Sequence, residues 1–205
     1  MIHKSALRIC LAASVLWIPF AARLVAQQPT CNKCSATYIK SEEIQEYLQR
    51  VPKNLVVSDQ QVRATDIGKA HVDIGVVYRG KLAAGSTTSP AAEHDLVSEV
   101  YHIIDGSGTL VTGWDVVDMK RRPADDTAVK MLNGPGNNGP SIRNGVTYQL
   151  KPGDVVMIPA GVGHWFTKID DHISYLMVRI DPDSVTPLKD DAASRKDLDT
   201  GFKPR

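Results

Sequence analysis

The sequence predicts an all-β domain preceded by a short helical region. Between residues 62 and 181 the chain alternates segments rich in β-branched and aromatic residues with turns of glycine, proline and aspartate. No segment in that range has a long helical period. A chain of 205 residues, of which 42% are hydrophobic, is long enough to bury one core. We therefore expect one globular domain, built as a sandwich or closed barrel of short strands.

The first 26 residues have the layout of a secretory signal. Lys4 and Arg8 precede an uncharged apolar run over residues 9–22, which is too short to span a bilayer comfortably. Ala26 offers a cleavage point before Gln27. The alternative is an uncleaved anchor at the N-terminus. We expect a secreted or periplasmic protein that has no membrane attachment after signal cleavage.

The mature chain is expected to be nearly neutral. Cleavage after residue 26 removes three of the 24 basic residues and none of the 23 acidic ones, so the balance becomes −2. Binding of nucleic acid needs a clustered excess of lysine and arginine. The densest basic stretch is only Lys120-Arg121-Arg122, which we interpret as a solvated turn. We therefore expect no nucleic-acid partner.

Residues 27–61 contain a close pair of cysteines and a short helix. Cys31 and Cys34 are three positions apart, and in an exported protein such a pair is most simply a local disulfide. A redox-active pair is the alternative, whereas haem attachment would need histidine directly after the second cysteine, where this chain has serine. Ser41, followed by an acidic first turn, predicts a helix that ends before Pro52.

Short strand segments follow, each bounded by turn residues. They are residues 72–78, 100–104, 109–112, 155–158 and 173–180. Residues 132–140 are rich in glycine, asparagine and proline and are predicted to form a loop, which either covers the site or is a surface excursion. Residues 182–205 are charged and weakly apolar, so we expect a polar tail that is extended or frayed.

Two patches about fifty residues apart carry the candidate chemistry, and the second is the more regular. It contains Gly153, Pro159, Gly161 and His164. Proline, glycine and aspartate at 152–154 favour a turn, and the apolar residues after them favour a strand. A second turn at the following proline and glycine then lets His164 start the next strand with its side chain pointing inward.

This spacing resembles the second motif of the cupin superfamily. That motif is Gly, five residues, Pro, one residue, Gly, two residues and His, and the chain matches it without a gap. The resemblance covers about residues 70–181. It implies a cupin-type double-stranded β-helix, a jelly-roll-like barrel. The domain organisation expected is a signal peptide (1–26), a segment with the cysteines and the helix (27–61), the cupin barrel (62–181) and a polar tail (182–205).

The first cupin motif is matched only in part. Glu99 and His94 occupy the positions of its glutamate and its second histidine, but its first histidine falls on Ala92. His94, Glu99 and His164 remain as a set of two histidines and one carboxylate, so the loss of the first histidine indicates either a site with open metal positions or a decayed site. Glu93 could supply the missing ligand only through a bulge, because strand alternation puts it on the other face.

Two imidazoles and one carboxylate suit iron, manganese, nickel, copper or zinc, so the identity of the divalent metal stays open. Glu99 would be costly to bury unpaired, and a cation in the barrel gives its charge a partner. Further inward candidates would make a mostly apolar pocket: Tyr101, Tyr148, Met157, Trp165 and Tyr175. Arg179 either binds a substrate carboxylate or lies on the outer face.

The resemblance leaves the reaction open, because cupins include dioxygenases, isomerases, lyases and non-catalytic binding proteins. We expect an exported metal-binding protein that acts as an enzyme on a small molecule in the barrel, with a dioxygenase-like reaction favoured. The alternative is a non-catalytic protein that binds a metal or a small ligand. No catalytic residue is assigned. The resemblance also implies that a homodimer can form through the sheets.

Overall fold

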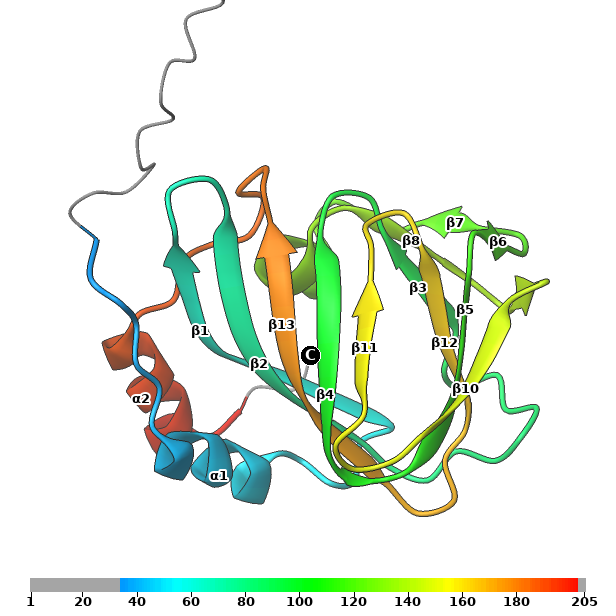
Figure 1. The fold of residues 1–205 in the computed structure, drawn as a ribbon, viewed down its shortest axis with the longest axis horizontal. Coiled ribbons are helices and arrows are strands. Elements are labelled where there is room, and N and C mark those ends of the chain that lie inside the picture. The colour runs from blue at the N-terminus through cyan, green and yellow to red at the C-terminus, as the bar shows by residue number, and fades with distance from the viewer. Residues whose placement is uncertain (1–33, 203–205) are drawn as a thin grey trace, which may run out of the picture.

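The computed structural model of the chain describes residues 34–202. Two antiparallel sheets face each other, and two helices pack beside the first two strands of one of them (Figure 1). The predicted signal peptide and Cys31 lie outside the described residues, so the disulfide between Cys31 and Cys34 stays a prediction.

The first sheet has five strands in the order β1-β2-β13-β4-β11. They are β1 (Val57–Asp66), β2 (His71–Arg79), β13 (Ile173–Asp181), β4 (Ser98–Gly106) and β11 (Val155–Ile158). The second sheet has six strands in the order β10-β5-β12-β3-β8-β7. They are β10 (Val146–Leu150), β5 (Gly108–Gly113), β12 (Gly163–Lys168), β3 (Ala91–His94), β8 (Gly136–Gly139) and β7 (Lys120–Arg121). A small third sheet pairs β6 (Asp115–Val116) with β9 (Ile142–Arg143).

The strand order is that of a jelly roll. The main strands alternate between the sheets, so that β2, β4, β11 and β13 lie in one and β3, β5, β10 and β12 in the other. In each sheet the last strand along the chain inserts between two earlier ones, β13 between β2 and β4 and β12 between β5 and β3. Two interlocked Greek keys of this kind define the jelly roll, the architecture that cupins share. The all-β, jelly-roll-like prediction is confirmed, with the described strands paired as separate sheets rather than as one closed ring.

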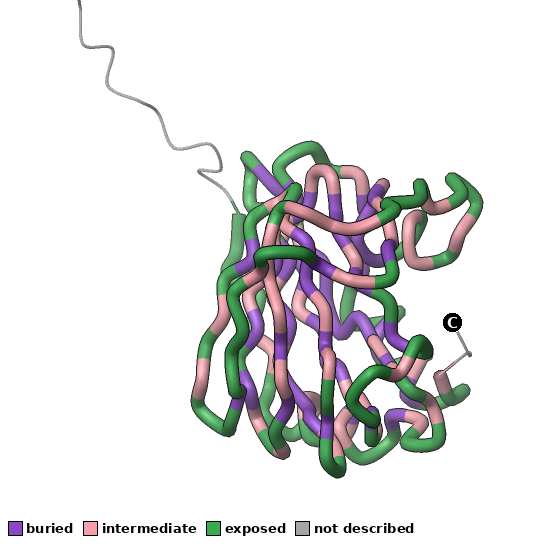
Figure 2. The backbone as a smooth tube through the Cα atoms, turned by 90° about the vertical axis from the view of Figure 1, so that its right-hand side faces the viewer, coloured by how far each residue is buried: buried purple, intermediate pink, exposed green. Residues whose placement is uncertain are grey.

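The main core lies between the two sheets, where one side chain in two points inward. In β4, Tyr101 and Ile103 are buried and His102 between them is exposed. Leu110, Phe166 and the other members of this core come from both sheets. Figure 2 shows buried stretches along the strands and exposed stretches at the turns.

A second core joins the helices α1 (Ser41–Arg50) and α2 (Asp191–Thr200) to the outer face of β1 and β2. Tyr47 of α1 and Leu198 of α2 are buried there against Val76. Neither helix, nor any other in residues 34–202, is long and apolar enough to cross a membrane.

The prediction of an extended or frayed tail after residue 181 is therefore wrong for α2. The side chain of Asp190 caps this helix by accepting a hydrogen bond from the backbone N–H of Ala193 at 2.8 Å. Tyr47 Oη and Ser194 Oγ lie 2.9 Å apart and tie the two helices together. The segment has a low average hydrophobicity because only one face of the helix is buried, which a compositional argument overlooks.

Two boundaries also differ from the prediction. The first sheet begins at Val57 rather than at residue 62. The expected loop over residues 132–140 contains the end of a short π-helix, η1 (Val129–Asn133), and the whole of β8, which pairs with β3. Both positions require glycine, because a Cβ atom at 136 would collide with the backbone oxygen of Glu93 in β3 and one at 139 with the backbone oxygen of Val117.

Candidate metal centre

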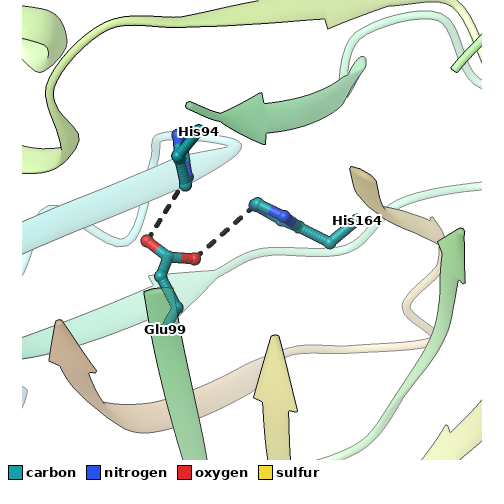
Figure 3. A group of neighbouring side chains, drawn as sticks. All are labelled: His94, Glu99 and His164. Carbon is teal, nitrogen blue, oxygen red and sulfur yellow. Dashed lines mark ion pairs between the residues drawn. The ribbon is translucent and has the colours of Figure 1, made fainter. Parts of the chain in front are cut away.

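His94, Glu99 and His164 come together between the two sheets (Figure 3). His94 ends β3, while Glu99 and His164 are the second residues of β4 and β12. His94 Nε2 lies 3.4 Å from Glu99 Oε1, and His164 Nε2 lies 3.6 Å from Glu99 Oε2. One donor atom from each residue lies within 4.8 Å of the other two, and all three residues are buried. The three side chains form one compact cluster, from segments up to seventy residues apart.

The strand register explains why these residues meet. Ala92 in β3 pairs with His164 in β12. Ala92 and His94 both line a cavity of about 230 Å³, as expected for residues two apart in a strand. Glu93, between them, accepts a hydrogen bond from Asn137 Nδ2 at 2.6 Å. Ala92, at the position of the missing histidine, therefore faces the cluster. Glu93 does not take the place of that histidine as a ligand.

Glu99 is held in an ionised state. Arg179 Nε donates to Oε1 at 3.1 Å and Tyr101 Oη donates to Oε2 at 2.8 Å. Burial alone would raise the pKa of Glu99, but His94 and Arg179 hold that pKa well below its usual range. Each carboxylate oxygen has two acceptor positions, so both oxygens can still face the histidines.

His164 is oriented to bind a metal through Nε2. Its Nδ1 lies 3.4 Å from the carbonyl oxygen of Val162, which assigns the ring proton to Nδ1. Burial lowers the pKa of His164 to about 4, so the ring is neutral at pH 7 and keeps its Nε2 lone pair. Histidines that ligate metals commonly donate from the other ring nitrogen to a carbonyl in this way.

His94 has the opposite arrangement. Arg122 Nη2 donates to His94 Nδ1 at 2.8 Å and to the carbonyl oxygen of Glu93 at 3.1 Å, and Arg122 Nη1 donates to Asn133 Oδ1 at 2.9 Å. Because arginine only donates, the neutral ring of His94 carries its proton on Nε2, facing Glu99. His94 can therefore bind a metal through Nε2 only after Arg122 withdraws and the proton moves to Nδ1.

The donor set fits a divalent transition metal, with one rearrangement at His94. Two imidazole nitrogens and one carboxylate oxygen lie within 4.8 Å of one another, and Ala92 leaves space beside His164. This set suits a metal with open coordination positions and does not select among iron, manganese, nickel, copper and zinc.

Two of the five predicted pocket residues line the cavity. The rings of Tyr101 and Tyr175 both face it, and their centroids lie 4.5 Å apart. Trp165 is half-buried between the inward residues of β12, and its Nε1 donates to the carbonyl oxygen of Ser89 at 2.9 Å. The prediction of an inward position is wrong for Tyr148 and Met157, which are 40% and 78% exposed on the edge strands β10 and β11. In β11 the other set of alternating residues faces the core, and that set ends at the buried residue 158.

Three charged residues of the cavity were missed in the sequence. Asp59, Arg79 and Arg122 line it, together with Arg179, which lies inside and is 1% exposed. Arg79 follows the buried Val77 by two positions, so the period of the strand is a signal that could have found it. No comparable local signal points to Arg122, which lies just after the two-residue strand β7.

No family model matches the chain, and no curated protein matches it. Among solved structures it is similar to protein BH2720 of Bacillus halodurans, at 12% identity and a TM-score of 0.41, over 76% of this chain and 87% of that one. It is also similar to KdgF from a Halomonas species, at 12% identity and a TM-score of 0.37, over 62% and 81%. A third is the DMSP lyase DddQ of Ruegeria pomeroyi DSS-3, at 19% identity and a TM-score of 0.37, over 67% and 54%.

Likenesses at this level concern the fold and carry no argument about the reaction. The classification rests instead on the strand order of the two sheets and on where the sequence motifs lie in them. His94 and Glu99 stand at the end of β3 and the start of β4, and His164 at the start of β12. On these grounds the chain has the cupin fold.

Proposed function

We propose that the chain is an exported, metal-dependent enzyme that acts on a small molecule in the cavity beside His94, Glu99 and His164. The observation that carries the proposal is the convergence of three buried donor atoms at a cavity of about 230 Å³. A metal bound there supplies Lewis-acid chemistry or activates oxygen. The proposal of export rests on the sequence of residues 1–26 alone.

The surrounding residues orient the donors. Arg179 and Tyr101 fix the two oxygens of Glu99. Burial raises the pKa of Tyr101 well above its usual value, and the nearby charge of Glu99 raises it further, so the phenol stays protonated and keeps donating. Position 92 carries only a methyl group opposite His164, which leaves room for substrate or water next to the donors.

A centre with two histidines, one carboxylate and open positions is the arrangement that non-haem oxygenases use. We therefore place an oxygen-dependent reaction first, ahead of an isomerase or lyase reaction. The cavity is smaller than the roughly 300–1,000 Å³ usual for drug-sized ligands, so the substrate is a small one.

Metal analysis tests the centre. Protein stripped with a chelator is reconstituted separately with iron, manganese, nickel, copper and zinc, and the bound metal is measured after desalting. We expect about one ion per chain for at least one metal, and near-complete loss in His164→Ala. His102→Ala is the matched control, because His102 is exposed on the opposite face of β4 and should leave metal binding unchanged. Far less than one ion per chain with every metal contradicts the proposal.

Turnover separates the enzyme from its alternative, a non-catalytic protein that holds a metal or a small ligand. The loaded protein is assayed for oxygen uptake and for products with phenols, diketones and sugar acids. Turnover that is lost in His164→Ala supports the enzyme. Stable metal retention with no oxygen uptake and no product across the panel supports the non-catalytic protein.

A further inference from the structure

The charged side chains that line the cavity are not balanced. Arg179 is paired with both Asp59 and Glu99. Arg79 and Arg122 also line the cavity, but within residues 34–202 neither forms an ion pair with a carboxylate. Two carboxylates thus face three guanidinium groups, and a divalent metal at the centre increases this positive excess.

Arg79 is held in place and still has donors to spare. Its Nε donates to Tyr175 Oη at 3.0 Å, and its guanidinium carbon lies 4.7 Å from the centre of the Phe166 ring. Nη1 has one long contact, 3.5 Å to Ser89 Oγ, and Nη2 has no hydrogen-bond partner among the described residues. Arg79 therefore offers two N–H groups in a fixed fork, the geometry that matches a carboxylate.

The other two arginines are less available to a ligand. Arg122 is engaged with Glu93, His94 and Asn133, and Arg179 is engaged with its two carboxylates. A largely buried cation without a counterion is unfavourable, so a bound anion offsets a cost that the cavity otherwise carries.

We propose that the cavity binds a small carboxylate, whose oxygens accept hydrogen bonds from Nη1 and Nη2 of Arg79. Val57, Val77 and Met177 also line the cavity and provide an apolar surface for the carbon part of the ligand. The cavity volume of about 230 Å³ is below the roughly 300–1,000 Å³ usual for drug-sized ligands, so the carboxylate belongs to a small molecule. This inference rests on the proposed function because it names the substrate class of the proposed enzyme. The anion site itself needs no metal.

The test uses metal-free protein, titrated with propionate and with its neutral isostere propionamide, with binding followed by NMR. We expect propionate to bind at least about tenfold more tightly than propionamide, because hydrogen bonds to a charged group are stronger than neutral ones. Arg79→Gln should remove most of this difference, and Arg79→Lys should keep part of it as a point charge. Arg143→Gln, which changes an exposed arginine paired with Asp115, should change nothing.

Equal affinity of the wild-type protein for the acid and the amide overturns the proposal, whether or not any variant folds. Unchanged propionate binding in folded Arg79→Gln, with folding checked by thermal melting, overturns the assignment to Arg79. Because the titration is done without metal, its failure leaves the metal centre untested. Conversely, His164→Ala should lose the metal and keep the preference for propionate.

Discussion

Replacing Arg122 with methionine should tighten metal binding. Arg122 Nη2 donates to His94 Nδ1 at 2.8 Å, which keeps the ring proton on Nε2, the atom 3.4 Å from Glu99 Oε1. A metal needs the Nε2 lone pair, so in the wild-type protein its binding breaks the hydrogen bond from Arg122. Methionine has a stem of similar length and no donor, so Nδ1 becomes free to take the proton.

The strength of the hydrogen bond from Arg122 to His94 sets the size of the gain in metal affinity. Hydrogen bonds to charged groups contribute about 1.5–3 kcal/mol net, and about 1.4 kcal/mol corresponds to a factor of ten in affinity. Metal affinity should therefore rise by roughly 10- to 100-fold in Arg122→Met. The wild-type side chain cannot relax at no cost, because Glu93 and Asn133 hold the same guanidinium in place.

Competition with a chromophoric chelator for zinc measures the affinity, and ¹⁵N NMR of the histidine rings in metal-free protein reports the tautomer. Arg121→Met is the matched control, since it removes the same charge from the adjacent residue, whose side chain is 56% exposed and paired with Asp95. Unchanged or weaker zinc binding in folded Arg122→Met refutes the reasoning. So does a wild-type spectrum that shows the His94 proton on Nδ1.

Three further predictions test the centre and the fold. Ala92→His places a fourth ligand opposite His164 and should tighten metal binding in the chelator assay, and unchanged affinity would mean that position 92 does not reach the metal. Asp73 is fully buried, and burial raises its pKa from 3.8 to about 6, so the folded state holds this proton more tightly than the unfolded state does. The contribution of Asp73 to the free energy of unfolding therefore falls as pH rises from about 4 to about 6. Asp73→Asn should remove that fall and stabilise the protein at pH 7 by on the order of 2–3 kcal/mol. Urea unfolding at pH 4 and pH 7 measures this, and the same pH dependence in both proteins contradicts it. Leu198→Ala should destabilise the protein by about 2–5 kcal/mol if α2 packs as described, whereas a loss below about 0.5 kcal/mol would show that it does not.

The position of His164 could be predicted because the turns that set it are local. Gly153 and Gly161 have φ values of +90° and +81°, which glycine adopts readily. These two glycines lie on either side of the strand β11, and His164 follows three residues after Gly161. The face of Met157 could not be predicted in the same way. A period of two gives a strand two faces, but only its partner strands decide which face meets the core.

The arginines of the cavity could not be predicted because their partners are remote in the chain. Arg179 is inside because it pairs with Glu99 and Asp59, which are 80 and 120 residues away. A charged residue in a strand is ordinarily expected at the surface. Only the pairing of β13 with β4, which sets Arg179 opposite Glu99, brings these groups together.

Arg179 also changes the argument for the metal. The expectation that Glu99 needs a cation for its charge is met without a metal, since Arg179 and Tyr101 already bind its two oxygens. The cluster can therefore persist in metal-free protein, and a metal would not be needed to hold these side chains together. Arg79 and Arg122, the two cavity arginines without a carboxylate partner within residues 34–202, then have opposite relations to ligands. Arg122 would compete with a metal for His94, whereas Arg79 would attract an anion whose charge offsets that of a metal.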